Sequence, residues 1–566
     1  MNTPRQADAT TPLTVSHLIV LWLGGLFALT TMGFWLGLPI GVWQAPLATL
    51  VILAIALTIG FDRRILGWLT LLAVSLLWAR FSRDFAWDSW VYHQPAIIAL
   101  LEGWNPLHEP SAATWLSRPE ALAQPHLTLI PERITLLLTH YGKATWVMAA
   151  AIAAAAGDLD SGKAINLLAV CASFGLGLRC FRQIGLSPRT SIGLATAVAL
   201  HAVGLAQMNA YYQDGLFGSL LLIAVFSALA WLKQRAAIDL IVFFIAVILA
   251  VNTKASAFLF CGVLVLWIAW QQRHDGRDRL RRPLAITAAA GVALLVLSIN
   301  PFLSNTLSNG HPFHPLNQRN IVANQIAADF QSLPMLVRFH RSLFSRSENS
   351  ASQPPTLTAP FSVQASELTV LRESYDTRIS GFGPLFGEAL YAALALLVGL
   401  LLVRRGALGA DARRLLTVAT LVLLSCALFS GGWWARYVPH LWCVPVLVAA
   451  AALNSGQRLA GWLLLALFGL NALLLYGARM PFLLQTYPAY QAAFESLTEP
   501  RSADPTGTLW LRPSSHRAAA ATLAYRLHAA GHTVRLADDQ ARCETPFAYI
   551  ALGCEPPASP ASMRDE

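Results

Sequence analysis

Two carboxylates, a tyrosine and a histidine lie close together in one short polar segment. Asp84, Asp88, Tyr92 and His93 follow an apolar run that ends at Phe81. A carboxylate can take the proton of an attacking hydroxyl or amine, and an imidazole can contact a phosphate. Because the segment comes directly after a run of membrane-spanning length, we expect this chemistry at a membrane surface rather than in a soluble core.

Charged and polar side chains recur at the ends of later apolar runs. Lys143, Lys254 and Arg436 are candidates to neutralise a phosphate leaving group. The other candidates for substrate contact or catalysis are Glu102, Asp158, Asp214, His311, His314 and Tyr437. Each of them alone is also compatible with a solvated or snorkelling side chain at a membrane boundary.

Structural alternatives stand beside several of these roles. Asp88 is placed where it could cap a helix over 89–101, and Asp84 and Asp88 could hold the base and cap roles in either order. Asp160 could cap a helix that begins near Ser161. Lys254 could snorkel between two spans, and Arg436 could belong to an interfacial aromatic belt with Trp433, Trp434 and Tyr437.

The sequence predicts no metal site. His311 and His314 have a spacing too short to indicate zinc, and Pro312 and Pro315 break any helix that would align the two rings. No tight cluster of Asp and Glu is visible either. No cofactor is predicted, and the use of a divalent cation stays open.

Composition indicates the elements that would position these residues. The chain has 566 residues, of which 55% are hydrophobic and 12% charged, whereas soluble domains carry roughly 25% charged residues. We therefore expect an all-α polytopic membrane protein with about thirteen spans of helical, membrane-crossing length. The predicted spans are 17–37, 43–60, 64–81, 162–181, 189–207, 215–232, 237–252, 255–270, 284–300, 385–403, 414–430, 437–453 and 458–477.

Orientation follows from the basic residues, since short cytoplasmic loops are enriched in Lys and Arg. With the amino terminus inside, every predicted inner connection is basic, beginning with Phe61-Asp62-Arg63-Arg64. The opposite face then receives the long loops 82–161 and 301–384 and the segment after 477. The net charge of +10 thus reflects topology, and no nucleic-acid-binding signature is present.

Two domains are expected: a membrane domain over 1–477 and a small periplasmic α/β domain over 478–566. In the second, 508–512, 533–536 and 547–552 have strand patterns and 518–530 a helical one. The loop 301–384 is expected to be irregular with one amphipathic helix near 331–344. Cys543 and Cys554 share the exported tail, where a disulfide or two free thiols are both compatible with the sequence.

Several of these segments, in this order, resemble the GT-C superfamily of integral-membrane glycosyltransferases, in particular the protein O-mannosyltransferase and aminoarabinose lipid A transferase group. The resemblance covers the membrane domain and not the tail. It is carried by the acidic first-loop segment with Asp88, Leu101-Glu102-Gly103-Trp104-Asn105-Pro106, Tyr141-Gly142-Lys143-Ala144, Tyr212-Gln213-Asp214-Gly215, Asn252-Thr253-Lys254, Gly381-Phe382-Gly383-Pro384-Leu385-Phe386 and Trp433-Trp434-Ala435-Arg436-Tyr437.

The resemblance implies an inverting transfer of a sugar from a polyprenyl phosphate to a lipid, glycan or protein acceptor on the periplasmic face of a bacterial inner membrane. Asp88 matches the first-loop acid, the general base, with Asp84 as its rival. Asp158 or Asp160 matches a second acidic position. The chain departs from the family pattern in one respect, because the acidic loop follows the third predicted span rather than the first.

Other functions are compatible with a polytopic chain. A transporter or flippase of a lipid-linked glycan would carry charges in the middle of its spans, and these spans are almost free of them. An O-antigen ligase or polymerase would act on a diphosphate-linked glycan with outer-loop Arg and His residues. A structural assembly partner, with the tail as its binding module, is a further alternative.

Overall fold

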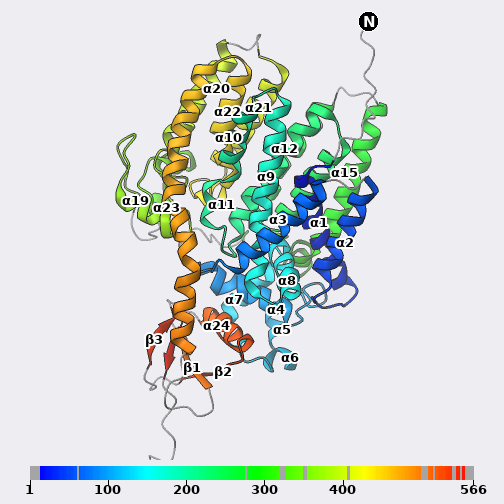
Figure 1. Ribbon diagram of the computed structural model, residues 1–566, viewed down its shortest axis with the longest axis vertical. Helices are drawn as coiled ribbons and strands as arrows, with labels where there is room; N and C mark the ends of the chain where they lie inside the picture. The colour runs from blue at the N-terminus through cyan, green and yellow to red at the C-terminus, as the bar shows by residue number, and fades with distance from the viewer. Residues whose placement is uncertain are drawn as a thin grey trace, which may run out of the picture.

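The computed structural model describes a mainly helical protein with one small sheet. The described residues are 13–59, 63–273, 277–317, 325, 327–348, 354–403, 408–498, 508–513, 517–537, 543–547 and 551–554. The helices pack side by side into a bundle, and a group of short helices with the sheet lies at one end of it (Figure 1). The predicted predominance of helix is confirmed.

Five helical segments among the described residues are long and apolar enough to cross a membrane. They are α1 (Val15–Trp35), the segment Leu159–Gln183 that contains η3 (Leu159–Lys163) and α9 (Ala164–Gln183), α12 (Gln213–Gln234), the part Leu280–Leu297 of α15 (Arg277–Leu297), and α23 (Arg458–Thr498). The other bundle helices are α2 (Gln44–Ile59), α3 (Arg63–Arg80), α8 (Ala144–Ala156), α10 (Pro188–Ala199), α13 (Ala237–Val251), α14 (Ala257–Gln272), α20 (Phe386–Val403), α21 (Ala410–Ala427) and α22 (Cys443–Asn454). A helix lies at each of the predicted apolar segments.

Helix α12 forms the centre of the bundle. Its sequence is apolar on every side, and residues 213–232 are all buried. A helix that is hydrophobic all round must be covered on all sides, and here α9, α13 and α14 provide neighbours. Asp214 lies in its first turn and Lys233 near its end, so these charges are separated by roughly 28 Å of apolar helix at 1.5 Å per residue.

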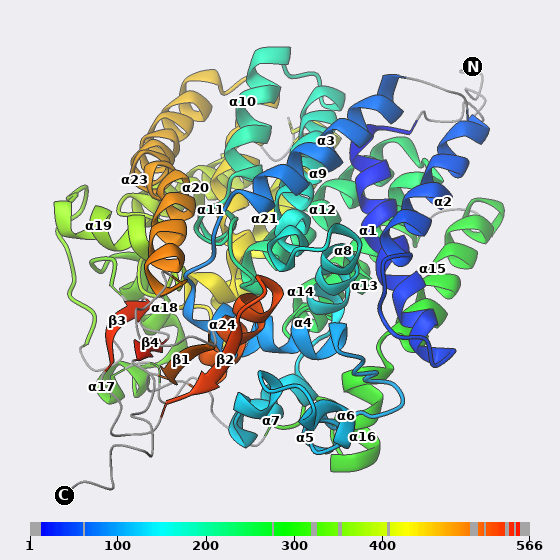
Figure 2. The same cartoon turned by 60° about the horizontal axis from the view of Figure 1, so that its bottom comes forward.

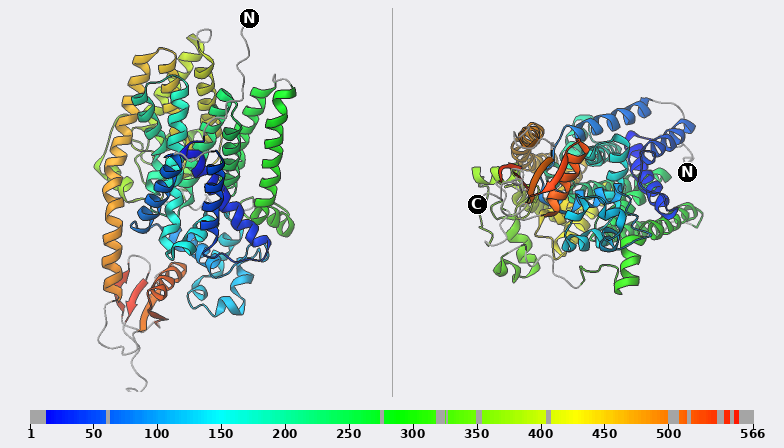
Figure 3. Two further views of the ribbon diagram at one scale, coloured as in Figure 1. Left: turned by 45° about the vertical axis from the view of Figure 1, so that its right-hand side comes forward. Right: turned by 90° about the horizontal axis from the view of Figure 1, so that it is seen from below.

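Two differences from the predicted elements concern length. Helix α8 lies inside the segment expected to be an outer loop, where it packs against α1, α2 and α4 (Gln94–Leu101). Its 13 residues are too few for the span-length criterion that guided the prediction. Helix α23 continues for 41 residues to Thr498, far beyond the expected end at 477. The expected domain boundary therefore falls within one continuous helix (Figure 3).

The end of the bundle that carries the sheet is built from short elements (Figure 2). Those of the 82–161 segment are η1 (Ser89–His93), α4, α5 (Ala112–Leu116), α6 (Pro119–Leu122), η2 (Leu127–Leu129) and α7 (Glu132–His140). Those of the 301–384 segment are η4 (Ile299–Leu303), α16 (Ser304–Asn309), α17 (Ala328–Gln331), α18 (Met335–Leu343) and α19 (Ala365–Glu373). Three further short helices lie in connections between bundle helices. They are α11 (Ala202–Ala206), between α10 and α12, and η6 (Ala435–Tyr437) and η7 (Pro439–Trp442), between α21 and α22.

The tail forms a four-stranded sheet with the strand order β2-β1-β4-β3. Strands β1 (Thr508–Pro513) and β2 (Thr533–Leu536) are parallel and are joined through α24 (Arg517–Ala529). The expected third strand over 547–552 is wrong in detail: β3 (Cys543–Phe547) and β4 (Ala551–Cys554) form an antiparallel pair there. Cys543 is disulfide-bonded. Cys554 lies directly opposite it in the β3–β4 pair, as a Cys543–Cys554 disulfide requires.

A buried ionic cluster joins the tail to the rest of the chain. The carboxylate of Asp160 forms ion pairs with Arg526 of α24 at 2.6 Å, with Arg83 at 2.5 Å and with Lys163 at 2.7 Å. Arg526 also donates to Gln94 of α4 at 2.7 Å. The alternative interpretation of Asp160 as a helix cap is therefore wrong, since three cations take up its oxygens. We call these residues, Arg83, Asp160, Lys163 and Arg526, the Asp160 cluster.

Candidate functional site

Five charged side chains from distant parts of the sequence meet at the end of the bundle near η1. The Arg436 guanidinium lies at the centre. Its Nη1 donates to Asp88 Oδ2 at 2.9 Å, and its Nε lies 3.5 Å from Asp376 Oδ1 and 3.7 Å from Asp214 Oδ2. Lys254 forms an ion pair with Asp214. We call this group, Asp88, Asp214, Lys254, Asp376 and Arg436, the Arg436 cluster.

Each member of the cluster is held at the end of an element. Asp88 immediately precedes η1, Asp214 is in the first turn of α12, and Lys254 lies in the connection between α13 and α14. Asp376 follows α19, and Arg436 is in η6. Helix and loop ends are free of the side-chain crowding inside a bundle, so charged groups from separate helices can converge there.

Two side-chain hydrogen bonds and one backbone hydrogen bond hold Asp376 beside Arg436. Arg378 donates from Nε to Asp376 Oδ2 at 2.7 Å, and Trp434 donates from Nε1 to Asp376 Oδ1 at 2.9 Å. The backbone N–H of Arg436 donates to the Thr377 carbonyl at 3.2 Å, which ties the two segments directly. With Arg378 included, three cations face three carboxylates.

Gln207 joins the segments that carry Asp214 and Asp376. Its Nε2 donates to the Tyr375 carbonyl at 3.0 Å, and its Oε1 accepts from the Gly215 N–H at 2.7 Å. The side chain is buried, so both amide groups are satisfied by these backbone partners. Loss of this amide would leave two buried backbone groups unpaired next to the cluster.

Aromatic rings form the walls around the cations. The Arg436 guanidinium lies 4.6 Å from the Trp434 ring and 5.2 Å from the Tyr212 ring, and Lys254 Nζ is 3.9 Å from the Tyr437 ring. Tyr92 also reaches the cluster, through a hydrogen bond to Asp88. These contacts place the cations over ring faces, where the quadrupole attracts positive charge.

His93 is uncharged in this surrounding. Burial lowers its pKa to about 3, an effect that the nearby Asp214 only partly opposes. Its Nδ1 accepts a hydrogen bond from Trp146 Nε1 at 2.8 Å, and its ring lies 4.2 Å from that of Tyr92. A neutral imidazole in this position can donate a hydrogen bond to a ligand, but it brings no positive charge for a phosphate.

The electrostatics give Asp88 the properties of a proton acceptor. Burial raises the pKa of Asp88, Arg436 opposes the rise, and Asp376 adds to it. Its side chain is nevertheless 16% exposed. Burial also lowers the pKa of Lys254, to about 8, against the attraction of Asp214. Burial has the same lowering effect on Arg436, but its three carboxylate neighbours raise the pKa above the ordinary value, so the guanidinium stays charged.

Asp84 has a structural role instead. Its Oδ1 accepts from the Ala86 N–H at 2.8 Å and its Oδ2 from the Tyr211 N–H at 2.9 Å, and its side chain is buried. Both carboxylate oxygens thus hold backbone. Asp88 makes no capping hydrogen bond, and the backbone groups that Asp84 binds lie outside the helix that follows, so neither side chain caps it. The accessible carboxylate is that of Asp88.

Asp158, Glu102 and Lys143 were also predicted as site residues, but their contacts are with residues outside the Arg436 cluster. Asp158 accepts a hydrogen bond from Ser161, and Glu102 lies 3.4 Å from His126 of the same loop. Lys143 is buried between the Trp104 and Trp146 rings and donates to the Thr139 and Tyr141 carbonyls.

The two loop histidines form a separate unit. His311 accepts from the Phe313 N–H at 3.1 Å, and the His314 ring lies 4.8 Å from that of His140. His140 in turn contacts Asn305 at 2.6 Å. These contacts stabilise the turn after α16, and no described contact joins either histidine to the Arg436 cluster.

Asp376 and Gln207 were not predicted from the sequence. Both lie in irregular segments without a recognised motif, and only the fold brings them to the cluster. The signal that was available is the pair Asp376-x-Arg378 in the 301–384 segment, because an acid and a base two residues apart in a loop can form a local ion pair. Among the described residues, no group of three or more His, Cys, Asp and Glu side chains could hold a metal ion.

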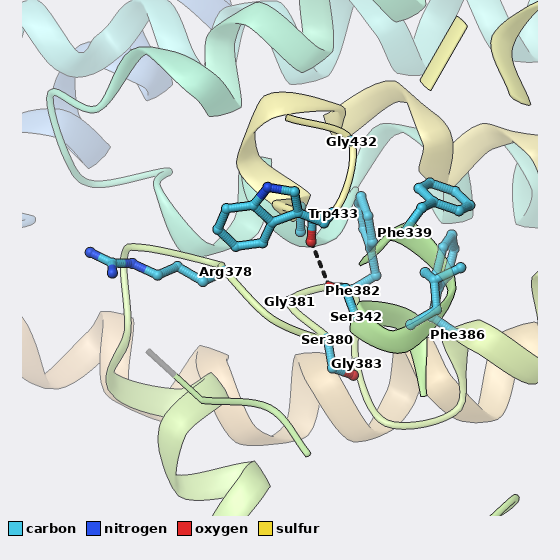
Figure 4. A pocket seen from close by; sticks show the side chains of 12 residues that line it. Phe339, Ser342, Arg378, Ser380, Gly381, Phe382, Gly383, Phe386, Gly432 and Trp433 are labelled. Carbon is cyan, nitrogen blue, oxygen red and sulfur yellow. Dashed lines mark hydrogen bonds between the residues drawn. The ribbon is translucent and has the colours of Figure 1, made fainter. Parts of the chain in front are cut away.

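A small cavity lies between α18, the 378–386 segment and the 432–435 segment (Figure 4). Its volume of about 10 Å³ is enough for roughly one water molecule. Its lining includes Arg378, Gly381, Gly383 and Trp433, whose carbonyl accepts from Ser342 Oγ at 2.5 Å. A cavity of this size cannot hold a sugar, and none of the five residues of the Arg436 cluster lines it.

No family model, no curated protein and no solved structure matches the chain. Its function is therefore inferred from the residues and contacts described above.

Proposed function

We propose that this protein is a membrane glycosyltransferase that uses a polyprenyl-phosphate-linked sugar and acts on a lipid, glycan or protein acceptor. The Arg436 cluster carries this proposal. It combines a partly exposed carboxylate of raised pKa with two cations, the groups required to deprotonate an acceptor and to receive a departing phosphate.

In the proposed reaction, the acceptor oxygen or nitrogen attacks the anomeric carbon from the side opposite the phosphate. Asp88 takes the acceptor proton while the bond from the anomeric carbon to the phosphate oxygen breaks. The phosphate leaves with that electron pair, and the configuration of the sugar inverts. Arg436 and Lys254 stabilise the growing negative charge of the leaving group, and a positioned base of this kind is worth roughly 10²–10⁴-fold in rate.

The proposed setting is a bacterial inner membrane, crossed about thirteen times, with the cluster and the tail on the periplasmic face. Support comes from the separation of charge along α12, which has Asp214 of the cluster in its first turn and Lys233 at its other end. Lys233 forms an ion pair with Asp411 at the start of α21, near the connections predicted to be basic and cytoplasmic. The cluster would then face the compartment in which lipid-linked sugars are consumed.

The contacts give less support to transport. Asp239 is buried in the first turn of α13, where it pairs with Arg179 and His17. Arg479 is buried in the middle of α23, where it donates to the Arg372 and Ala206 carbonyls. A substrate path would require a series of ionisable groups in the middle of the spans. An O-antigen ligase or polymerase remains the alternative within the transferases, and it differs in using a diphosphate-linked glycan.

The decisive test is Asp88→Asn in the intact protein in its membrane. The amide has the same shape but cannot take a proton, so we expect the modified glycan, glycolipid or glycoprotein to disappear from envelope mass spectra while the donor lipid accumulates. Glu120→Gln is the matched control, since Glu120 is an exposed acid of the same loop outside the cluster. Unchanged modification by a normally inserted Asp88→Asn protein would refute the mechanism.

A further inference from the structure

A group of exposed apolar side chains surrounds the start of α20. They are Leu336, Val337, Leu357, Phe361 and Val363, which we call the α20 collar. Leu336 is 56% and Phe361 65% exposed. An exposed apolar patch of this kind marks a contact surface rather than ordinary solvent-facing surface.

Hydrogen bonds hold the collar segments against the first two turns of α20. His340 of α18 contacts the Tyr391 hydroxyl at 2.7 Å, and the Phe361 N–H donates to Glu388 Oε1 at 2.8 Å. The Thr358 N–H donates to the Phe344 carbonyl at 2.9 Å, which joins the two collar segments to each other. The collar is therefore level with the end of an apolar helix whose own outward side chains, Tyr391 and Val398 among them, are exposed.

Helix α18 is amphipathic in the way of helices that lie in a membrane interface. Phe339, Ser342 and Leu343 are buried on one side, whereas Leu336 and Val337 point away from the core. In helices that lie in a membrane interface, outward apolar side chains of this kind enter the boundary between headgroups and acyl chains.

Two arginines of α18 lie three residues apart, and their guanidinium groups have no partner among the residues that the structure describes. Arg338 and Arg341 have no carboxylate or carbonyl acceptor among the described residues, and the Nε of each is buried without a hydrogen bond. Arg346, the next arginine along the chain, is different, because it pairs with Glu348 at 3.6 Å. The two guanidinium groups give the collar a positive charge that no carboxylate in the described ranges pairs with.

We propose that the α20 collar is a membrane-embedded contact surface for anionic phospholipid. Its apolar side chains enter the acyl region of the leaflet at the tail-bearing end of the bundle, and Arg338 and Arg341 bind headgroup phosphates. The occupant is the phospholipid of an intact bilayer rather than free phosphate. This inference uses the proposed membrane setting but not the proposed reaction, and its test does not depend on glycosyl transfer.

The collar is also connected to the Arg436 cluster. Ser342 of α18 donates to the Trp433 carbonyl, and the Ser342 carbonyl accepts from the Ser380 N–H at 3.1 Å. Both partners belong to the segments that carry Arg436 and Asp376. The lipid that holds α18 would thereby support the chain that forms one wall of the site.

The test uses a photo-crosslinking diazirine amino acid at position 337 of the full chain, in bilayer nanodiscs of phosphatidylcholine with or without phosphatidylglycerol. We expect phospholipid adducts from position 337 and none from position 120 in the exposed α6, with phosphatidylglycerol over-represented relative to its share of the bilayer. Adducts of water alone, or of a second protein copy, at position 337 would refute the collar. Gel filtration of each variant establishes that the protein is monodisperse before illumination.

The charge part is tested separately with the double variant Arg338→Gln/Arg341→Gln. We expect the preference for phosphatidylglycerol to fall to its bulk share while phosphatidylcholine adducts persist, and Arg346→Gln, the matched control, to leave the preference unchanged. A preference that survives the double variant would refute headgroup binding by these arginines.

Discussion

Asp84 and Asp88 lie one helical turn apart in sequence and serve opposite purposes. Asp84 uses both oxygens to hold the backbone of Ala86 and Tyr211, and Asp88 presents its carboxylate to Arg436 and to the exposed side of the cluster. A residue whose hydrogen-bonding capacity is consumed by backbone is unsuited to proton transfer. Burial alone therefore does not distinguish a base from a structural acid, and the identity of the hydrogen-bond partners does.

Asp84→Asn is expected to weaken folding rather than chemistry. An amide can accept one of the two N–H bonds but replaces the second acceptor by a donor, at a cost of roughly 1–3 kcal/mol. We expect a lower apparent melting temperature in detergent and near-normal turnover per folded molecule. Turnover that vanishes while the melting temperature is unchanged would contradict this assignment.

The pH profile of transfer should have two limbs. Asp88 must be deprotonated, so activity falls as the pH drops below its raised pKa. Lys254 must be protonated to stabilise the phosphate, and its pKa of about 8 means that activity falls as the pH rises through that value. The measurement is the initial rate against pH in nanodiscs.

Lys254→Arg separates the two limbs. A guanidinium keeps its charge at alkaline pH, so we expect the alkaline limb to move upward and the acidic limb to stay. An alkaline limb that stays near pH 8 in this variant would exclude Lys254 as its cause.

At the scale of elements, the Asp160 cluster fixes the start of the segment that presents Asp88. Arg83 lies directly before Asp84, and Lys163 also donates to the Ser82 carbonyl. One carboxylate thus holds the loop after α3, the start of α9 and helix α24 together. Removal of that carboxylate would deprive Arg83, Lys163 and Arg526, which are largely or fully buried, of their shared anionic partner.

We expect Asp160→Asn to cost roughly 3–5 kcal/mol of stability, the usual loss when one partner of a buried ion pair is removed. The measurement is the apparent melting temperature in detergent at constant pH and salt. Asp158→Asn is the matched control, two residues away, with a single side-chain contact to Ser161. Equal melting temperatures for the two variants would contradict the role assigned to Asp160.

The elements could be predicted more completely than the site. Apolar runs of span length indicated where the bundle helices lie, because length and hydrophobicity are local properties of the chain. Helix α8 was missed because its 13 residues are short and are buried by neighbours instead of by a span of their own. Asp88 could be proposed from its position after an apolar run. Asp376 could not, since its approach to Arg436 depends on how four separate segments pack.

At the scale of the whole molecule, the tail is a fixed part of the structure. Helix α24 contacts η1 and α4, and Phe547 of β3 packs against Trp90 with ring centroids 6.0 Å apart. The tail therefore lies directly against the turn that follows Asp88. This arrangement favours a supporting role over that of a freely moving recruitment module.

Arg526→Met should loosen the tail. The variant keeps an unbranched apolar stem but loses the guanidinium contacts to Asp160 and Gln94, so we expect faster proteolytic cleavage after the end of α23 at Thr498. Arg517→Met is the matched control, because Arg517 is on the exposed side of the same helix. Cleavage at the same rate in both variants would contradict the docking role of Arg526.

Helix α23 has a mechanical consequence. At 1.5 Å per residue its 41 residues measure roughly 60 Å, about twice the hydrocarbon thickness of a bilayer, and its far end contacts the sheet. In the proposed membrane setting, this helix, which contains Pro481 and Pro488, would link its lipid-covered half to the docked module. A bilayer that is thinner or thicker than the helix's apolar section would therefore press or pull on the turn beside Asp88, and membrane thickness would become a variable that tunes the site.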